Sequence, residues 1–133
     1  PALTWMTVIF VLSHQPGQTL HSFLPFFQHV FPSMKSFDWG HLAAYFILAI
    51  TLYIGLGSKR AHWRGRALAF LGSVFYGLTD EWHQHYVQNR ASDMQDLVRD
   101  AAGAFVAMVI FSIPVVHRFY AKIIQALEQK INS

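Results

Sequence analysis

The sequence predicts an all-α integral membrane protein: a bundle of four transmembrane helices, a short outer interfacial helix and a basic amphipathic C-terminal helix. Hydrophobic residues make up 53% of the 133 residues and charged residues only 13%, whereas soluble domains carry about 25% charged residues. The apolar residues also gather in four stretches that are separated by charges or by Gly and Pro. A chain of this length is expected to form one domain, residues 1–133.

The four apolar stretches are predicted to cross the membrane at about residues 1–14, 38–57, 65–85 and 95–117. A helix needs about 20 residues to cross the hydrocarbon core, and the first stretch is shorter than this. Because the chain opens on Pro1 rather than Met, we expect either that upstream residues complete the first span or that the bilayer is thin there. No run with strand periodicity competes with these helices.

Two further segments are amphipathic. Apolar residues recur at near-helical spacing from Phe23 to Phe31, which favours a short helix in the outer interface. After Pro114, an apolar stripe with Lys and Arg beside it continues to Ile131. This C-terminal helix either rests on the membrane or extends the fourth span.

The charges differ between the two sides of the predicted bundle. Seven of the ten Lys and Arg residues lie in the loop between the second and third spans or in the C-terminal tail, and six of the seven acids lie on the other side. The positive-inside rule makes the basic side cytoplasmic, so both termini are predicted to be cytoplasmic. This segregation fits membrane orientation better than nucleic-acid binding. The lack of Cys excludes disulfides, thiolate metal sites and Cys nucleophiles.

Ionisable residues of three predicted spans fall at nearly one depth. At a rise of 1.5 Å per residue, Asp80 lies roughly 21 Å from the inner charges, and His41 and Asp100 lie roughly 27 Å from them, within a core of about 30 Å. Charges at this depth are costly unless they face a partner or a polar cavity. The sequence therefore predicts a polar cavity that opens to the outer side.

Helical spacing indicates which side chains share a helix face toward this cavity. Asp38, His41 and Tyr45 lie at i, i+3 and i+7. Asp80 and Gln84 lie at i and i+4. The residues expected to collect in the cavity are Asp38, His41, Asp80, Glu81, Gln84, Arg90, Asp96 and Asp100.

Four pieces of the sequence resemble the VanZ-like family of small bacterial membrane proteins: SHQPG, DWGHLAAY, YGLTDEWHQHYVQNR and SDMQDLVRDAAGA. They lie within roughly residues 8 to 110, and the combination of DExHQ with R-x-S-x3-D-x3-D-x-x-G is the most specific part. The chain departs from the family by reading VQNR for VPGR and DW for DK. The resemblance implies a multi-pass protein of the bacterial cytoplasmic membrane and a link to teicoplanin resistance. The positions of this chain that match the family motifs, and that the resemblance implies as site residues, are Asp38, His41, Tyr45, Asp80, Glu81, Gln84, Arg90, Asp96 and Asp100.

The first class of function is binding or modification of a cell-envelope molecule, either a lipid-linked precursor or a lipoglycopeptide. If the protein is an enzyme, a metal-assisted hydrolase or transferase, the catalytic residues would be Glu81, His41 and Asp80. The substrate would contact Arg90, Tyr45, Gln84 and Asp38. A divalent cation would be bound by Asp80, Asp96 and Asp100. These oxygen ligands favour Mg²⁺ or Ca²⁺, and a histidine ligand would admit Zn²⁺.

The second class is a non-enzymatic structural or partner-binding module, in which buried Asp, His and Arg side chains pair to specify helix packing. Transport is a weaker third class, because four spans are few and no helix is interrupted at mid-membrane. Membrane lipids are the expected partners in every case, and nucleic acid is not expected.

Overall fold

The computed structural model describes residues 1–30, 32, 38–57, 62–87 and 93–132. Within these ranges the chain is all-α, with six helices and no strand, as the sequence predicts. The helices are α1 (Ala2–Ser13), α2 (Gly17–Val30), α3 (Asp38–Gly55), α4 (Trp63–Gln84), α5 (Met94–Ile110) and α6 (Pro114–Ile131).

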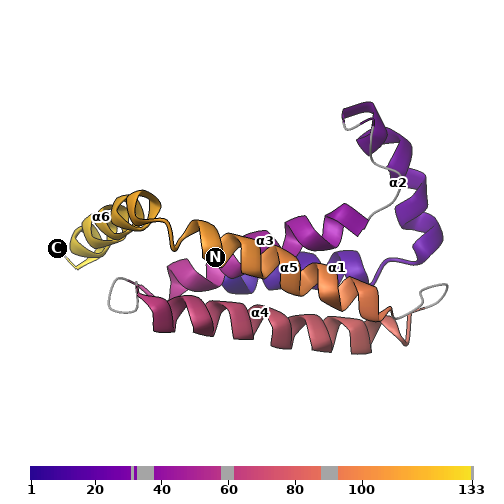
Figure 1. Ribbon diagram of the computed structural model, residues 1–133. Coiled ribbons are helices and arrows are strands. Elements are labelled where there is room, and N and C mark those ends of the chain that lie inside the picture. Colours follow the sequence, from indigo (N-terminus) through magenta and orange to yellow (C-terminus); the bar gives the residue numbers. More distant parts are fainter. Residues whose placement is uncertain (31, 33–37, 58–61, 88–92, 133) are drawn as a thin grey trace.

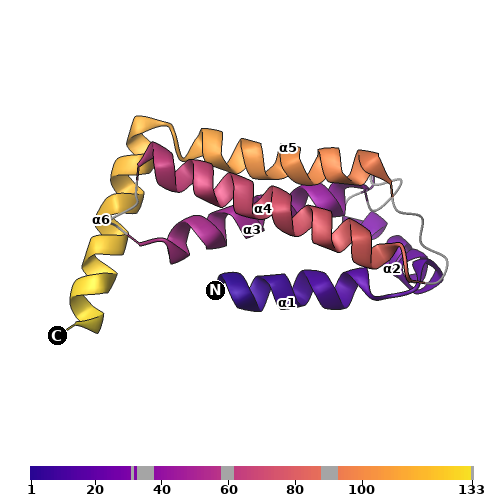
Figure 2. The same ribbon diagram turned by 90° about the horizontal axis from the view of Figure 1, so that it is seen from below.

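The helices α1, α3, α4 and α5 run side by side, and α2 and α6 lie at opposite ends of this bundle (Figure 1). The helix α3 packs against α1, α4 and α5, and α4 packs against α1 and α5. The last helix, α6, crosses the end at which α3 finishes and α4 begins (Figure 2). The other end of the bundle contains the start of α3 and of α5 and the last turns of α1 and α4.

The helices α3 and α5 approach each other very closely at Gly103. A Cβ atom on Gly103 would lie only 2.1 Å from the carbonyl oxygen of Leu42, so no other residue fits there without a backbone shift. Small residues permit such close helix contacts in membrane proteins. The contact brings His41, which precedes Leu42, opposite Asp100, which lies one turn before Gly103.

Two hydrogen bonds from aromatic side chains attach α1 to the bundle. Trp5 Nε1 donates to the main-chain oxygen of Ala44 on α3 at 2.8 Å. Tyr76 OH on α4 donates to the main-chain oxygen of Met6 at 2.7 Å. Because buried Trp and Tyr side chains need a partner for their polar atom, these bonds fix α1 between α3 and α4. They set the position of Ser13, at the end of α1.

The helix α6 is attached to the bundle through Tyr120. Its OH donates to the main-chain oxygen of Tyr53 at 3.1 Å, and the two rings stack with centroids 4.8 Å apart. Phe111 packs edge-on against both rings. This aromatic group belongs to the hydrophobic core, with Ile124 of the same helix. The basic C-terminal helix is therefore part of the fold.

The fourth predicted span, residues 95–117, requires a correction because the helix breaks within it. The helix α5 ends at Ile110, α6 begins at Pro114, and the two are bent by 85°. A proline has no N–H to donate, and its ring clashes with the carbonyl of the residue four positions earlier, here Ile110. The C-terminal helix does not extend α5, which removes one of the two alternatives that the sequence left open.

The other three predicted spans, 1–14, 38–57 and 65–85, each coincide with one helix to within two residues at either end. Taken singly, none of the described helices has both the length and the hydropathy needed to cross a bilayer. The bent pair of α5 and α6 has the length and the hydropathy needed for a span only when its two helices are counted together. The topology of four spans stays a prediction.

The predicted interfacial helix is present as α2, and it contains Pro25. Phe26 on this helix is strongly exposed. The side chains of Phe23 and Phe27 and the whole of Phe31 lie outside the described residues. Whether α2 lies in a membrane interface also stays a prediction.

Candidate functional site

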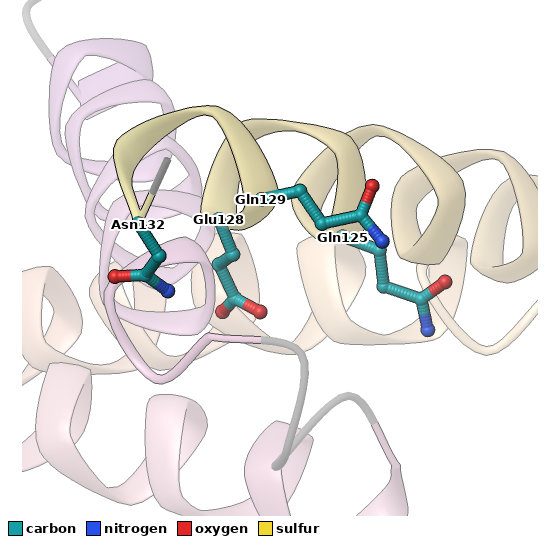
Figure 3. Close-up of a pocket in the computed structure, with 4 residues that line it drawn as sticks. All are labelled: Gln125, Glu128, Gln129 and Asn132. Atoms are coloured by element: carbon teal, nitrogen blue, oxygen red, sulfur yellow. The ribbon is translucent and has the colours of Figure 1, made fainter.

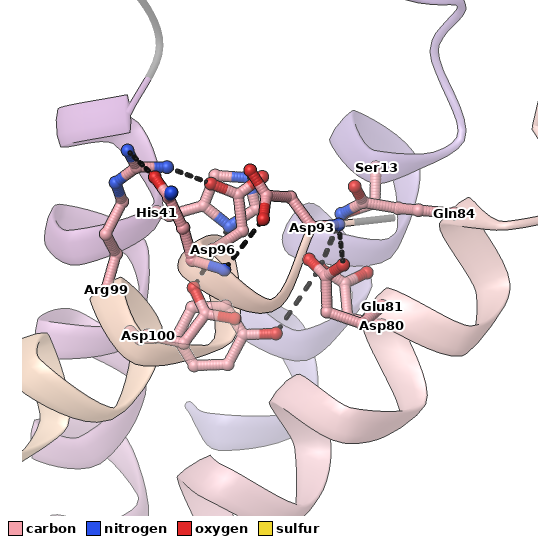
Figure 4. Close-up of polar contacts among 11 residues, drawn as sticks. Ser13, His41, Asp80, Glu81, Gln84, Asp93, Asp96, Arg99 and Asp100 are labelled. Atoms are coloured by element: carbon pink, nitrogen blue, oxygen red, sulfur yellow. Dashed lines mark hydrogen bonds and ion pairs between the residues drawn. The ribbon is translucent and has the colours of Figure 1, made fainter. Parts of the chain in front are cut away.

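Polar and ionisable side chains from α1, α3, α4 and α5 gather at the end of the bundle next to α2 (Figure 4). Most of these side chains are buried or half-buried. We call this set the polar cluster, and its members are Ser13, His41, Tyr45, Asp80, Glu81, Gln84, Asp96, Arg99 and Asp100.

Asp80 is buried, and one of its oxygens accepts three hydrogen bonds. Its Oδ2 accepts from Ser13 Oγ at 2.9 Å, Tyr45 OH at 3.3 Å and Gln84 Nε2 at 3.1 Å. The donors come from α1, α3 and α4. A buried acceptor loses its hydrogen bonds to water, and these donors replace them. Asp80 therefore ties three helices together.

A second group of contacts leads from the rim of the cluster to its floor. His41 Nδ1 lies 3.0 Å from Asp100 Oδ1, and His41 Nε2 lies 3.7 Å from Asp96 Oδ2. Asp96 also accepts a hydrogen bond from Arg99 Nη1. The side chains of Arg99, Asp96, His41 and Asp100 are 29%, 18%, 16% and 0% exposed. Water reaches the arginine, and the last carboxylate is fully enclosed.

Glu81 joins the end of α4 to the start of α5. Its Oε2 accepts a hydrogen bond from the main-chain N–H of Asp93 at 3.1 Å. Asp93 is the N-cap of α5, and its side chain accepts from the main-chain N–H of Gln95 at 2.9 Å. The carboxylate of Glu81 is buried despite its place near the helix end.

His41, Glu81 and Asp100 come from three different helices and converge on one point. Each offers one nitrogen or oxygen atom, and these three atoms all lie within 4.8 Å of one another. Among the described residues, these three form the group whose atoms lie close enough together to bind one metal ion. An imidazole and two carboxylates are a chemically suitable set for a divalent cation.

Asp100 has one oxygen without a hydrogen-bond partner among the described residues, its Oδ2. A Cβ atom on Gly77 of α4 would lie 3.1 Å from this oxygen. The carboxylate can therefore approach α4 this closely because position 77 has no side chain. A buried acceptor without a partner costs about 1–3 kcal/mol, and more if it is charged.

The structure brings together most of the predicted site residues. The predicted residues found in the polar cluster are His41, Tyr45, Asp80, Glu81, Gln84, Asp96 and Asp100. Arg90 and the side chain of Asp38 lie outside the described residues. The predicted metal ligands were Asp80, Asp96 and Asp100, and only Asp100 belongs to the group that the structure brings within ligand distance. The catalytic and binding roles stay predictions.

Two members of the cluster were not among the predicted site residues. Ser13 has no charge, and its only signal was its place in the SHQPG piece. Arg99 follows Asp96 by three positions, and that spacing puts the two on one helix face. A neighbouring pair was also missed: His14 and His83 stack, with His14 Nδ1 3.2 Å from His83 Nε2.

A separate pocket lies on α6, at the other end of the bundle (Figure 3). One carboxylate and three amides line it, contributed by Glu128, Gln125, Gln129 and Asn132. It shares no residue with the polar cluster.

The fold and the polar cluster define a small all-α protein that buries ionisable side chains between helices at one end of a bundle. The chain matches the family model described as VanZ/LLP1 over residues 1–116, and it belongs to that family. Proteins of this family are generally membrane proteins. The matched region contains every member of the polar cluster. No curated protein and no solved structure matches the chain.

The contacts of Asp80 generate a test of the cluster. Tyr45→Phe removes one donor and is expected to lower the free energy of unfolding in detergent by about 1 kcal/mol. In an Asp80→Ala background the same change should cost less than about 0.5 kcal/mol, because the acceptor is already gone. Thr79→Ala is the control, since the exposed Thr79 hydroxyl bonds only within α4. Equal costs of Tyr45→Phe in both backgrounds would contradict the contact.

Proposed function

We propose that this chain is a multi-pass protein of the bacterial cytoplasmic membrane whose polar cluster faces outward and binds a cell-envelope molecule. The observation that carries the proposal is that three buried carboxylates, a fourth half-buried carboxylate and a half-buried histidine lie together at one end of the bundle. Ionisable groups placed in this way are costly for the fold, so they indicate a function.

The distribution of basic residues supports the outward orientation. Arg118, Lys122 and Lys130 lie on α6, and Arg64 and Arg66 lie in the first turn of α4. Both helix segments are at the end opposite the polar cluster (Figure 2). By the positive-inside rule this basic end is cytoplasmic, which leaves the cluster on the outer side.

The rim of the cluster suits an anionic head group with an apolar tail. Arg99 can form two parallel hydrogen bonds with a phosphate or a carboxylate. Large apolar side chains of α4, of the turn that follows it and of α5 are exposed at the same end and would contact an acyl chain. These exposed side chains are Trp82, Tyr86, Met94 and Val98.

Lipid-linked envelope precursors and lipoglycopeptides combine these two chemical features. Membership of the VanZ/LLP1 family supports a connection with glycopeptide resistance, and teicoplanin is the lipoglycopeptide that we propose as the test ligand. Binding alone breaks no bond. The catalytic roles of Glu81, His41 and Asp80 in a metal-assisted hydrolase or transferase are a further step within this proposal.

A specific observation favours a second candidate, a structural module. Asp80 is held by donors from three helices, which is the arrangement expected of a residue that specifies packing. In that case the cluster would set the helix arrangement, and changes at its rim would leave any resistance phenotype intact.

The outward orientation can be measured by cysteine labelling, because the chain contains no Cys. Tyr86→Cys places a thiol at an exposed position beside the polar cluster, and Gln129→Cys places one on α6. In intact cells of a Gram-positive host, a membrane-impermeant maleimide is expected to label the first variant. The second should react only after permeabilisation. The reverse pattern would show that the polar cluster faces the cytoplasm.

Binding of an envelope molecule can be tested by resistance. Expression in a susceptible Gram-positive host is expected to raise the minimal inhibitory concentration of teicoplanin more than that of a glycopeptide without an acyl chain. Arg99→Gln and Asp96→Asn should abolish the increase, because these two side chains are the most exposed of the chain of contacts and form its rim. Arg64→Gln, at the basic end, is the matched control. If the rim variants keep full resistance at equal abundance in the membrane, the structural module is the better account.

A further inference from the structure

We propose that His41, Glu81 and Asp100 bind one divalent transition-metal ion, with Zn²⁺ preferred over Mn²⁺ and Mg²⁺. The proposal concerns the floor of the polar cluster and is independent of the envelope molecule. It differs from the sequence-based set of Asp80, Asp96 and Asp100, because the helices α3, α4 and α5 bring a different trio together.

The separations of the three ligand atoms are close to those of a metal site. All three lie within 4.8 Å of one another. Two ligands on opposite sides of one zinc ion are about 4.2 Å apart, and tetrahedral neighbours are closer. His41 Nδ1 and Asp100 Oδ1 are already 3.0 Å apart. Small side-chain rotations of His41, Glu81 and Asp100 would therefore bring all three onto one ion.

A second observation, on one of the three candidate ligands, also points to a bound cation. Asp100 is fully buried, and its Oδ2 has no hydrogen-bond partner among the described residues. A Cβ atom on Gly77 would lie 3.1 Å from this oxygen, so α4 approaches it closely but offers it no side-chain donor at that position. An enclosed carboxylate oxygen is unfavourable unless it is paired, and a metal ion is a partner that such an oxygen accepts.

The contacts of His41 resemble those of a metal-binding histidine. Such a histidine binds the ion through one ring nitrogen and directs the other toward a carboxylate. Here Nδ1 faces Asp100, and Nε2 faces Asp96 at 3.7 Å. Asp96 is in turn held by Arg99. Glu81 is fixed by the main-chain N–H of Asp93. The candidate ligands are thus positioned by neighbours that do not themselves bind the ion.

Charge and ligand type select the class of metal. The polar cluster contains four carboxylates and one guanidinium, so a divalent ion would offset much of the excess negative charge. An imidazole among the ligands favours a transition metal over Mg²⁺, and Zn²⁺ binds such sets more tightly than Mn²⁺ does. Three protein ligands leave a fourth position for water or for an anionic oxygen of a bound molecule.

Zinc binding can be measured on the purified full-length chain in detergent after treatment with EDTA. Titration with ZnCl₂ against a chromophoric chelator is expected to give one Zn²⁺ per chain, and millimolar MgCl₂ should not displace it. His41→Asn and Glu81→Gln should each weaken binding by at least about 100-fold. Asp96→Asn should weaken it by about 10-fold through loss of histidine orientation. His14→Ala, in the neighbouring histidine pair, is the control and should leave the affinity unchanged.

The proposal is overturned if the wild-type chain binds no zinc, if Glu81→Gln binds as tightly as the wild type, or if His14→Ala loses binding as His41→Asn does. Should a variant fail to fold, Co²⁺ bound to the wild-type chain decides. Visible absorption bands of an imidazole and carboxylate complex support the site, and their absence overturns it. Resistance and zinc binding are separate readouts, so the failure of one is distinguishable from the failure of the other.

Discussion

A carboxylate buried between helices is stable only when a donor or a cation meets it, and the polar end of this bundle is built around that requirement. Asp80 accepts hydrogen bonds from three side chains, and Glu81 accepts one from the main chain of Asp93. Asp100 meets His41 with one of its two oxygens. Apart from the bond from Gln84, which lies within α4, these contacts join different helices or a helix and the N-cap of the next one. The groups that are costly to bury are therefore also the groups that hold α1, α3, α4 and α5 together.

These contacts depend in turn on positions that have no side chain. A side chain at Gly103 would strike the carbonyl of Leu42, and one at Gly77 would crowd Asp100. Both glycines lie inside helices, where glycine is less favourable than alanine by about 1 kcal/mol. In return, the two glycines allow the backbones of neighbouring helices to approach closely. This close approach lets His41 on α3 reach the carboxylate of Asp100 on α5, next to α4.

Much of the fold follows from the sequence, because long apolar stretches bounded by charges set three of the helices to within two residues. The similar depths estimated for His41, Asp80 and Asp100 correctly indicated that they gather at one end. The break before Pro114 was not predicted, since the hydropathy continues through Phe111 and hides the end of α5. The helical spacing of the sequence also could not show whether Asp80 or Glu81 is the candidate metal ligand. Adjacent carboxylates in a helix point in directions about 100° apart, and only packing decides which one faces His41.

The central claim is that His41 and Asp100, from distant parts of the chain, meet inside the bundle. The most direct measurement is the distance between the ¹⁵N-labelled Nδ1 of His41 and the ¹³C-labelled side-chain carboxyl of Asp100, by dipolar NMR of the protein in lipid bilayers. Since Nδ1 and Oδ1 are 3.0 Å apart, a nitrogen–carbon distance of about 4 Å or less is expected. The absence of a measurable coupling, in protein that is folded in the bilayer, would contradict the account.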